Sequence, residues 1–555
     1  MFKYKQTKRR KAGTGCLIVL ITIISGCWLF SLRLHITPPV VSDVNKLIDK
    51  EITLAETGER VFNGCFLRQS NSGLWEMYLE GNAFERGIAA GKLGKDLLKF
   101  QEDVFIEQIK KNIPSEFYLK FLRIFIGIFN RNLAANIPEE FKEEIYGMSL
   151  SCSDEYNYIG SPYERQLNYH AAHDLGHALQ DFRLVGCTSF AAWGDATNDS
   201  TLLIGRNFDF YAGDDFAKNK MVVFYAPKTG YKFVSVSWAG MSGVLSGMNE
   251  KGLTVTINAA KSSIPFSSAT PVSILCREIL QYASTLEEAK QIASKRKLFV
   301  SESILIGSAV DDSALIIEKS PEKEGIYQTS GKWLACANHF QSEIFQKDKR
   351  NIENIRISDS PYRQQRMEEL IVGSLPLNHE KSAFILRNKE GLSDVNIGLG
   401  NEKSINQLIA HHSVIFKPKQ KQIWVSTSPW QIGEYVCYDL NKIFNSPDFS
   451  SEIKTENLTI AADTFLTSTG FKDFLFYREY SQRLKSIIRK KETANEEDIN
   501  RFISSNPEMY LVYNLTGDYY FSQKKTVRAH EFWKLALEKE IPTLKERELI
   551  QAKLP

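Results

Sequence analysis

The sequence lacks a strong excess of charge of either sign. Its 69 lysines and arginines are nearly balanced by 66 aspartates and glutamates, which leaves a net charge of +3 over 555 residues. Much of that surplus lies in the first eleven residues. Because the remainder is balanced, no basic surface for nucleic acid is indicated, and we expect no nucleic-acid partner.

Cysteine is sparse and follows no recognisable spacing. The eight cysteines are Cys16, Cys27, Cys65, Cys152, Cys187, Cys276, Cys336 and Cys437. They form no CxxC pair, which argues against a zinc ribbon or a disulfide-dense module and leaves room for one or two disulfides. The chain also lacks a repeat array and low-complexity tracts. Its hydrophobic content of 43% is ordinary for a globular protein.

One long hydrophobic run is present, directly after the basic N-terminal residues. The mainly apolar segment from Gly15 to Leu32 is about 18 residues long, enough to cross a bilayer as one helix. A basic flank before such a segment indicates export and places most of the chain on the extracytoplasmic side. The letters ISGC at Ile24–Cys27 allow a second interpretation, a lipoprotein signal acylated at Cys27. We favour an uncleaved membrane anchor within residues 1–36, because the apolar run continues past Cys27.

The spacing of apolar residues divides the rest of the chain into three parts. Residues 43–186 are predicted to be mainly helical, because the stretches DLLKFQEDVFIEQIKKNI and FYLKFLRIFIGIFNRNLAANI space their apolar residues three and four apart. Residues 187–450 contain short alternating runs joined by polar turns, which predict blocks of strands with helices between the blocks. This order favours sheets covered by helices over alternating strand–helix units. Residues 455–555 return to a helical pattern.

The C-terminal part contains a stretch that resembles one tetratricopeptide-type helical pair. The residues near the expected spacing are Tyr513, Gly517, Tyr520, Ala529, Trp533, Ala536 and Pro542. Such units normally stack in several copies, so a single copy favours a helical cap over the core. A protein partner bound at these helices is the alternative.

Cys187, in the stretch RLVGCTSFAAWG, stands apart from any obvious partner. Taken singly, it is consistent with a small buried apolar residue. As a nucleophile it needs a base, and four histidines at longer range could serve: His170, His173, His177 and His339. Cleavage after Gly186 would supply another base, since a free α-amine has a pKa of about 8. An N-to-S acyl shift at the unhindered Gly186 carbonyl, followed by hydrolysis, would release that amine.

The stretch VGCTSFAAWG followed by LLIGRNFDF resembles the N-terminal-nucleophile hydrolases. Further stretches follow in family order, namely GNAFERGIAAGKL, GMNEKGLTVTINA, ACANHF, SPYRQQRM and HHSVIFKPKQKQIWVS. The chain is most similar to peptidase family C45, the acyl-coenzyme A:6-aminopenicillanic acid acyltransferases, which are related to choloylglycine hydrolase and penicillin V acylase. The resemblance covers about residues 80 to 440.

This resemblance implies an α+β fold with a four-layer αββα sandwich as its catalytic core. The core would be built mainly from residues 187–450. Residues 43–186 would become the smaller chain after self-cleavage, and residues 455–555 would form a helical extension.

The resemblance also assigns the central catalytic roles. Cys187 would be the nucleophile, and its freed α-amine would be the base. Asp209 would hold and orient the resulting ammonium group. Arg206 would lie near the thiolate and lower the pKa of the thiol by its charge.

Four further residues are assigned by matching motifs. Asn258 and Asn338 would donate side-chain N–H groups to the oxyanion of the tetrahedral intermediate. Arg363 would support the site, with Ser360 beside it.

Together these roles predict a self-processing amidohydrolase or acyltransferase, cleaved between Gly186 and Cys187. It would act on a small acylated and lipophilic substrate, an N-acyl amide or an acyl thioester, through a thioester on Cys187. No metal or organic cofactor is needed for this chemistry. Two alternatives remain. One is a phospholipase-B-like ester hydrolase with the same nucleophile and fold, and the other is a non-catalytic membrane-tethered scaffold or binding protein.

The stretch YHAAHDLGHALQD allows a metal-site interpretation that we do not favour. His173 and His177 are four residues apart, with Asp174 beside the first, and this spacing is able to bind zinc. The stretch lacks the glutamate next to the first histidine that HExxH metalloproteases use. We favour a helix that precedes the cleavage site.

Overall fold

The computed structural model describes residues 36–41, 47–55, 58–112, 115, 126–171, 186–261, 268–445 and 451–555. The predicted membrane anchor, apart from its last residue, lies outside these ranges, as do His173, Asp174 and His177. In the ranges that are described, no helix combines the length and apolar character needed to cross a membrane.

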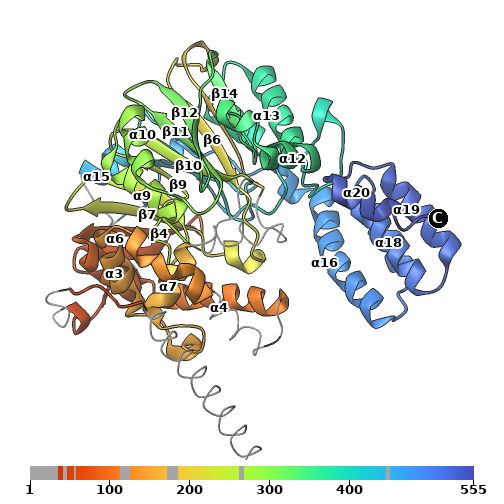
Figure 1. The fold of residues 1–555 in the computed structure, drawn as a ribbon, viewed down its shortest axis with the longest axis horizontal. Coiled ribbons are helices and arrows are strands. Elements are labelled where there is room, and N and C mark those ends of the chain that lie inside the picture. Colours follow the sequence, from red (N-terminus) through yellow and green to blue (C-terminus); the bar gives the residue numbers. More distant parts are fainter. Residues whose placement is uncertain are drawn as a thin grey trace, which may run out of the picture.

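Two β-sheets form the centre of the described part of the chain (Figure 1). The larger sheet has eleven strands in the order β1(Thr53–Leu54), β2(Arg60–Phe62), β3(Cys65–Gln69), β4(Trp75–Gly81), β7(Met221–Pro227), β8(Phe233–Ser237), β9(Ser246–Asn249), β10(Leu253–Ala259), β11(Glu302–Ser308), β12(Ser313–Lys319) and β13(Glu324–Tyr327). Its neighbouring strands are antiparallel except for the parallel pair β4 and β7.

The smaller sheet has six antiparallel strands. Their order is β14(Trp333–Cys336), β5(Thr188–Ala192), β6(Leu203–Phe208), β15(His412–Lys417), β16(Gln422–Ser426) and β17(Tyr435–Asp439).

Side chains alternate between two hydrophobic layers along each strand, which stacks the two sheets face to face. In β12, Ile316 faces the cluster shared by the two sheets, while Leu315 and Ile317 face the cluster on the outer side of the larger sheet. In β16, Val425 faces the shared cluster and Trp424 faces the outer side of the smaller sheet. Both sheets are therefore apolar on both faces and need a cover on each outer side.

Helices supply that cover and complete four layers. The larger sheet is covered by α3(Ala83–Leu93), α9(Val272–Tyr282) and α10(Leu286–Lys295), and the smaller sheet by α13(Ser360–Ser374) and α14(His379–Leu386). The other helices before residue 450 are α4(Lys95–Asn112), α6(Glu139–Ser149), α7(Pro162–His170), α11(Glu343–Gln346), α12(Lys349–Ile357) and α15(Leu440–Asn445). The predicted α+β fold with an αββα sandwich is confirmed.

The prediction that residues 43–186 are mainly helical was wrong for residues 53–81. This stretch forms β1 to β4 and extends the larger sheet beyond the predicted core. The hairpin β2–β3 turns at Asn63 and Gly64, which have φ values of 50° and 82°. An Asn-Gly pair with positive φ at both residues is the preferred two-residue hairpin turn, and in β4 the apolar residues Trp75, Met77 and Leu79 alternate as strand residues do.

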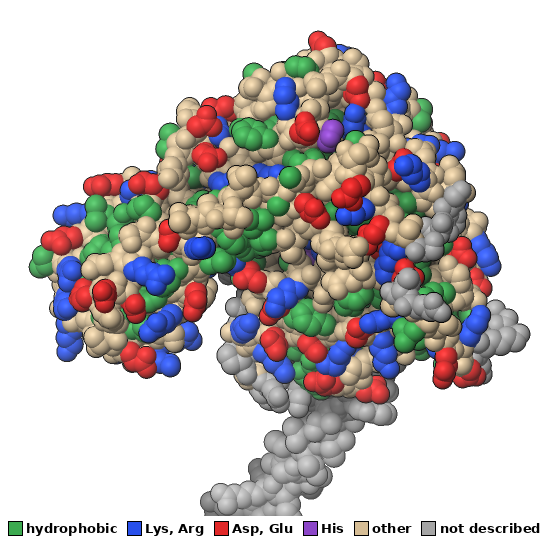
Figure 2. Space-filling view, turned by 180° about the vertical axis from the view of Figure 1, so that it is seen from behind, with side chains coloured by type: hydrophobic (Ala, Val, Ile, Leu, Met, Phe, Trp, Pro, Cys, Tyr) green, Lys and Arg blue, Asp and Glu red, His purple; other side chains and the backbone are tan. Residues whose placement is uncertain are grey.

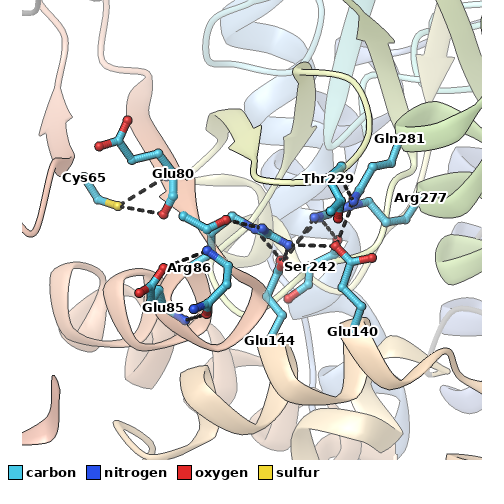
Figure 3. A network of polar contacts seen from close by, with 12 residues as sticks. Cys65, Glu80, Glu85, Arg86, Glu140, Glu144, Thr229, Ser242, Arg277 and Gln281 are labelled. Carbon is cyan, nitrogen blue, oxygen red and sulfur yellow. Dashed lines mark hydrogen bonds and ion pairs between the residues drawn. The ribbon is translucent and has the colours of Figure 1, made fainter. Parts of the chain in front are cut away.

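A buried ion-pair network ties the N-terminal helices to the core (Figure 3). Glu144 in α6 accepts from Arg86 of α3 at 2.7 Å and from Arg277 of α9 at 3.1 Å. All three side chains are almost completely buried. Burial alone would raise the pKa of Glu144, but the guanidinium groups of Arg277 and Arg86 hold that pKa below its ordinary value.

A separate helical unit follows the sandwich and lies to one side of it (Figure 1). It consists of α16(Thr469–Lys490), α17(Glu496–Ser505), α18(Tyr510–Ser522), α19(Thr526–Leu537) and α20(Leu544–Gln551), which share one apolar core. Within the tetratricopeptide-like stretch, Gly517 packs against Trp533 so closely that an added Cβ would lie 2.5 Å from the ring.

Acidic and basic side chains are interspersed over the molecular face in Figure 2.

Candidate active site

Cys187 lies directly before β5, where the two sheets face each other. Strand β5 pairs with β6, so Ser189 lies opposite Arg206, and the backbone N–H of Gly186 donates to the carbonyl of Asp209 at 2.9 Å. Arg206 and Cys187 are completely buried. The strand pairing thus brings the predicted nucleophile, its arginine and the predicted ammonium-binding aspartate to one place.

Arg206 is held rigidly beside the sulfur. Its Nη2 lies 3.8 Å from Cys187 Sγ and donates to the carbonyl of Ile257 at 2.5 Å, while its Nη1 donates to the carbonyl of Leu245 at 3.0 Å and to Ser246 Oγ. Burial raises the pKa of Cys187 to about 11, and Arg206 opposes that rise. Arg206 lowers the pKa of the Cys187 thiol, as predicted, but in the intact chain burial raises that pKa by more.

Asp209 is completely buried and neither carboxylate oxygen has a hydrogen-bond partner among the described residues. Burial raises the pKa of Asp209 to about 7, against the opposing charges of Arg363 and Arg206. A carboxyl group with this pKa can take up and release a proton near neutral pH.

The Gly186 carbonyl oxygen, on the predicted scissile bond, accepts from two side chains. Arg363 Nη1, in the first turn of α13, lies 3.3 Å from this oxygen and 3.0 Å from the carbonyl oxygen of Cys187. Gln407 Nε2 lies 3.1 Å from the Gly186 oxygen. Two donors on one carbonyl oxygen polarise the C=O bond toward attack.

The two predicted oxyanion donors have other partners in the intact chain. Asn258 Nδ2 donates to the carbonyls of Cys336 and Ala337 at 2.9 and 3.3 Å. Asn338 Nδ2 donates to the carbonyl of Ala259 at 2.8 Å, and its Oδ1 accepts from Arg363 at 2.9 Å. The amides lie at the site, but their role as oxyanion donors stays a prediction.

Ser360 contacts the polypeptide next to Asn338 rather than the sulfur. Its Oγ accepts from the backbone N–H of Asn338 at 2.7 Å and lies 2.8 Å from His339 Nδ1. Burial and the charge of Arg363 lower the pKa of His339 to about 4, so this imidazole is neutral at pH 7. Ser360 and His339 therefore position the Asn338 segment.

The family comparison agrees with this geometry. The family described as "Acyl-coenzyme A:6-aminopenicillanic acid acyl-transferase" matches residues 196–428. The resemblance seen in the sequence is confirmed. The matched range includes six of the predicted site residues, Arg206 to Arg363, and begins after Gly186 and Cys187.

Two relatives share 23% identity with this chain over their aligned parts. One is a protein of Archaeoglobus fulgidus described as uncharacterized, aligned over 401 residues, which are 66% of this chain and 66% of that protein. The chain thus spans just under two thirds of that relative's length. The other is "Protein dcd1A" of Dictyostelium discoideum, aligned over 407 residues, which are 66% of this chain and 85% of that protein.

Three solved structures show weaker similarity. The Caenorhabditis elegans ortholog of N-acylethanolamine-hydrolyzing acid amidase is 17% identical with a TM-score of 0.31, over 42% of this chain and 93% of that one. A conjugated bile acid hydrolase of Clostridium perfringens is 14% identical with a TM-score of 0.31, over 46% and 93%. Penicillin V acylase of Agrobacterium tumefaciens is 15% identical with a TM-score of 0.30, over 46% and 87%.

A buried histidine pair at the start of β15 belongs to the site and was not predicted. His412 Nε2 lies 2.8 Å from Ser246 Oγ and 3.4 Å from Arg206 Nη1, and its Nδ1 lies 2.9 Å from His411 Nδ1. Burial, with neighbouring positive groups, holds the pKa of both histidines well below the ordinary value. Both imidazoles are therefore neutral, and His412 contacts Arg206 while His411 contacts His412. The adjacent histidines were visible in the stretch HHSVIFKPK, whereas Gln407 gave no sequence signal.

An aromatic pocket adjoins the site. Phe208 lies below the Arg206 guanidinium at 4.2 Å and stacks on Phe210 and Trp238, in the same hydrophobic cluster as Cys187. The pocket itself is lined by Leu98, Gln101, Glu102, Phe105, Gln166, Tyr169, Phe210, Phe216, Trp238, Ala239 and Gly240. Its wall is mostly apolar, which suits a lipophilic group better than a charged one.

The remaining candidates have structural roles or fall outside the described ranges. His170 is buried, with Nδ1 at 2.7 Å from the carbonyl of Gln166 and Nε2 accepting from Ser242 N at 2.9 Å. In the part of the chain that is described, no three or more His, Cys, Asp or Glu side chains gather as metal ligands do. The cysteines resolved there, from Cys65 to Cys437, are all free thiols.

Proposed function

We propose that this protein is a self-processing N-terminal-nucleophile enzyme that cuts its own chain between Gly186 and Cys187 and then transfers or hydrolyses acyl groups. One observation carries the proposal. A buried cysteine, a buried arginine and a buried carboxylate without a partner among the described residues converge on one glycine–cysteine bond. A packing role alone does not explain why these three side chains lie together, because burying a carboxylate without a hydrogen-bond partner costs stability.

Self-cleavage begins when Sγ of Cys187 attacks the carbonyl carbon of Gly186. A C–S bond forms, the C–N bond breaks, and the thiol proton ends on the released amine of Cys187. Asp209 would carry that proton, and its pKa of about 7 supports this role. Water then hydrolyses the thioester, which gives a carboxylate on Gly186 and a free thiol on Cys187.

The processed enzyme uses its new N-terminus for catalysis. The α-amine of Cys187 takes the thiol proton, and Asp209 holds the ammonium form. The sulfur attacks the carbonyl of an N-acyl amide or acyl thioester, and the acyl group remains as a thioester until water or an amine accepts it. The aromatic pocket behind Phe208 would receive a lipophilic acyl group. The N-terminal segment would hold the enzyme at the membrane, with its bulk outside the cytoplasm.

Intact mass spectrometry of the purified wild type beside Cys187→Ala tests the first half of the proposal. The wild type should give two chains, the second beginning with Cys187, while Cys187→Ala should remain whole. A wild type that remains whole would remove the amine base and the mechanism with it.

A panel of N-acyl amides, acyl thioesters and phospholipids tests the second half. Release of the acyl group from amides or thioesters supports the proposal. Release of fatty acid from phospholipids alone would instead favour the phospholipase-B-like alternative. A chain that stays whole and binds partners equally well with Cys187→Ala would favour the scaffold.

A further inference from the structure

Gln407 reaches the predicted scissile bond from a part of the chain 221 residues away. It lies in an irregular segment, residues 396–411, that precedes β15. Its side chain is 3% exposed, and its Nε2 donates to the Gly186 carbonyl oxygen at 3.1 Å. Arg363 is the other donor to this oxygen, but its Nη1 is shared with the carbonyl of Cys187. The amide of Gln407 is the donor directed at the Gly186 oxygen.

The side-chain amide of Gln407 packs so closely against Gly186 that no side chain at position 186 would fit beside this amide. A Cβ added to Gly186 would lie 2.6 Å from Gln407 Nε2 and 3.0 Å from Gln407 Oε1. Real Cβ atoms do not approach other atoms so closely, so a side chain at 186 would displace the amide. Glycine at 186 therefore does more than leave the carbonyl unhindered, because it lets the glutamine reach it.

We infer that Gln407 is a catalytic residue of self-cleavage, whose amide N–H donates to the Gly186 oxygen as that oxygen becomes an oxyanion. The inference rests on the proposed self-cleavage. When Sγ attacks, the C=O π electrons move onto this oxygen, and a donor already aligned on it stabilises the charge. When the C–N bond breaks, the electrons return and the C=O bond reforms in the thioester, so Gln407 neither gains nor loses a proton.

The C-terminal helical unit holds the segment that carries Gln407. Asn506, between α17 and α18, accepts from the backbone N–H of Leu399 at 3.0 Å and donates to the carbonyl of Leu399 at 2.9 Å. Asn401 Nδ2 donates to the carbonyl of Glu540 at 2.9 Å, and Lys403 forms an ion pair with the Glu540 carboxylate.

Packing adds to these hydrogen bonds. Leu408, next to Gln407, is buried in the same cluster as the helical unit. Gly398 lies so close to Met509 that an added Cβ would be 2.6 Å from its backbone. The helical unit, which lies beyond the family match ending at residue 428, is thus a positioning element for a residue at the site.

To test this inference, the protein is made in a short pulse of cell-free translation, and the amount of uncleaved full-length chain is then followed over time by intact mass spectrometry. We expect Gln407→Leu to slow cleavage roughly 10²- to 10³-fold, the usual loss for one oxyanion donor. Gln431→Leu is the matched control, because Gln431 is also a buried glutamine and its side-chain atoms have no hydrogen-bond partner among the described residues. It should cleave at the wild-type rate.

Gln407→Glu separates a chemical role from a structural one. The glutamate keeps the shape of glutamine and can donate only when it is protonated. We therefore expect its deficit against the wild type to narrow as pH falls. A wild type that never splits would overturn both this inference and the proposed function. A wild type that splits, with Gln407→Leu splitting equally fast or Gln407→Glu lacking this pH dependence, would overturn the inference alone.

Asn506→Ala tests the positioning role of the helical unit. Loosening the segment should slow cleavage roughly tenfold, because small displacements of an aligned group are costly. Asn514→Ala is the control, since Asn514 lies on α18 and accepts from Lys553 rather than from the segment. Equal rates for Asn506→Ala and the wild type would overturn the positioning role and leave the Gln407 donor in place.

Discussion

Among the charged side chains buried in the described part of this protein, two clusters differ in how they are paired. In the network of Figure 3, Glu144 lies between Arg86 and Arg277, and its pKa is below the ordinary value. At the candidate site, Asp209 is equally buried, but its carboxylate oxygens have no hydrogen-bond partner among the described residues, and burial raises its pKa to about 7.

Glu144 and Asp209 illustrate the difference between a buried charge with a structural role and one available for catalysis. Desolvation acts on both carboxylates, and only the paired one is compensated. A compensated charge stays ionised and holds elements together, as Glu144 joins α6 to α3 and α9. An uncompensated carboxyl group is unstable as an ion and ready to exchange a proton, which is the property that a catalytic group needs.

The largest expected effect comes from breaking the paired cluster. Glu144→Gln leaves two buried guanidinium groups without their shared partner, and we expect a loss of about 3–5 kcal/mol in the free energy of unfolding. Urea unfolding in the Cys187→Ala background, which keeps one chain, measures it. Glu353→Gln, which removes an exposed pair with Arg356, should change nothing measurable. An unchanged unfolding midpoint for Glu144→Gln would contradict the structural role of the network.

The second prediction concerns pH and Asp209, in the same Cys187→Ala background. Because the folded pKa of Asp209 is raised, the folded state binds its proton more tightly than the unfolded state does. The resulting stability is fully present below the ordinary pKa, near pH 4, and is lost as pH rises to about 7, by at most about 1.4 kcal/mol per pH unit.

Comparing unfolding with and without Asp209→Asn isolates this dependence. The difference in unfolding free energy between the two proteins should change steadily between about pH 4 and pH 7. The protein that keeps Asp209 should become less stable relative to Asp209→Asn as pH rises. Parallel stability curves would show that Asp209 does not titrate in this range. The lowered pKa of Glu144 predicts the opposite sign, with stability lost as pH falls.

Arg206→Lys should have a smaller effect. A lysine ammonium has one nitrogen and lacks the planar fork that donates to two backbone carbonyls and holds the charge beside the sulfur, so the opposition to the raised pKa of Cys187 weakens. We expect self-cleavage to slow roughly 10- to 100-fold and its pH profile to move upward. Arg296→Lys, which alters a pair with Glu278 far from the sulfur in sequence, is the control. An unshifted profile would remove Arg206 from the chemistry.

The smallest effect should come from a pair near the surface. Arg478 of α16 contacts Asp214 at 2.7 Å, and the Asp214 side chain is 54% exposed. Solvent screens such pairs, so Arg478→Ala should cost less than about 1 kcal/mol of unfolding free energy. A loss as large as that of Glu144→Gln would mean that burial is not what distinguishes the two kinds of pair.

Much of this organisation is predictable from sequence, where local pattern and residue order carry the signal. Alternation after Cys187 gives the strands, and the order of stretches brings Arg206, Asp209, Asn258, Asn338 and Arg363 to one site. The strands between residues 53 and 81 were missed because the helical spacing that begins at Asp96 was extended over the whole segment, although the Asn63–Gly64 turn is a hairpin signal.

Two features of the site had no local signal. The contact of Gln407 with Gly186 joins residues 221 positions apart and follows no periodicity. The net rise in the pKa of Cys187 depends on burial between the sheets, which no motif reports.

The parallel pair β4 and β7 has a consequence once the chain is cut. Strand β4 lies before residue 186 and β7 after it, so one continuous sheet would then be shared by two polypeptides. Unfolding would become a dissociation, and its midpoint would depend on protein concentration. Reassembly from the separated pieces would be second order, so dilution would oppose it. The Gly186–Cys187 peptide bond would make only the first folding unimolecular, because it is broken afterwards. Activity lost after cleavage would therefore be hard to recover.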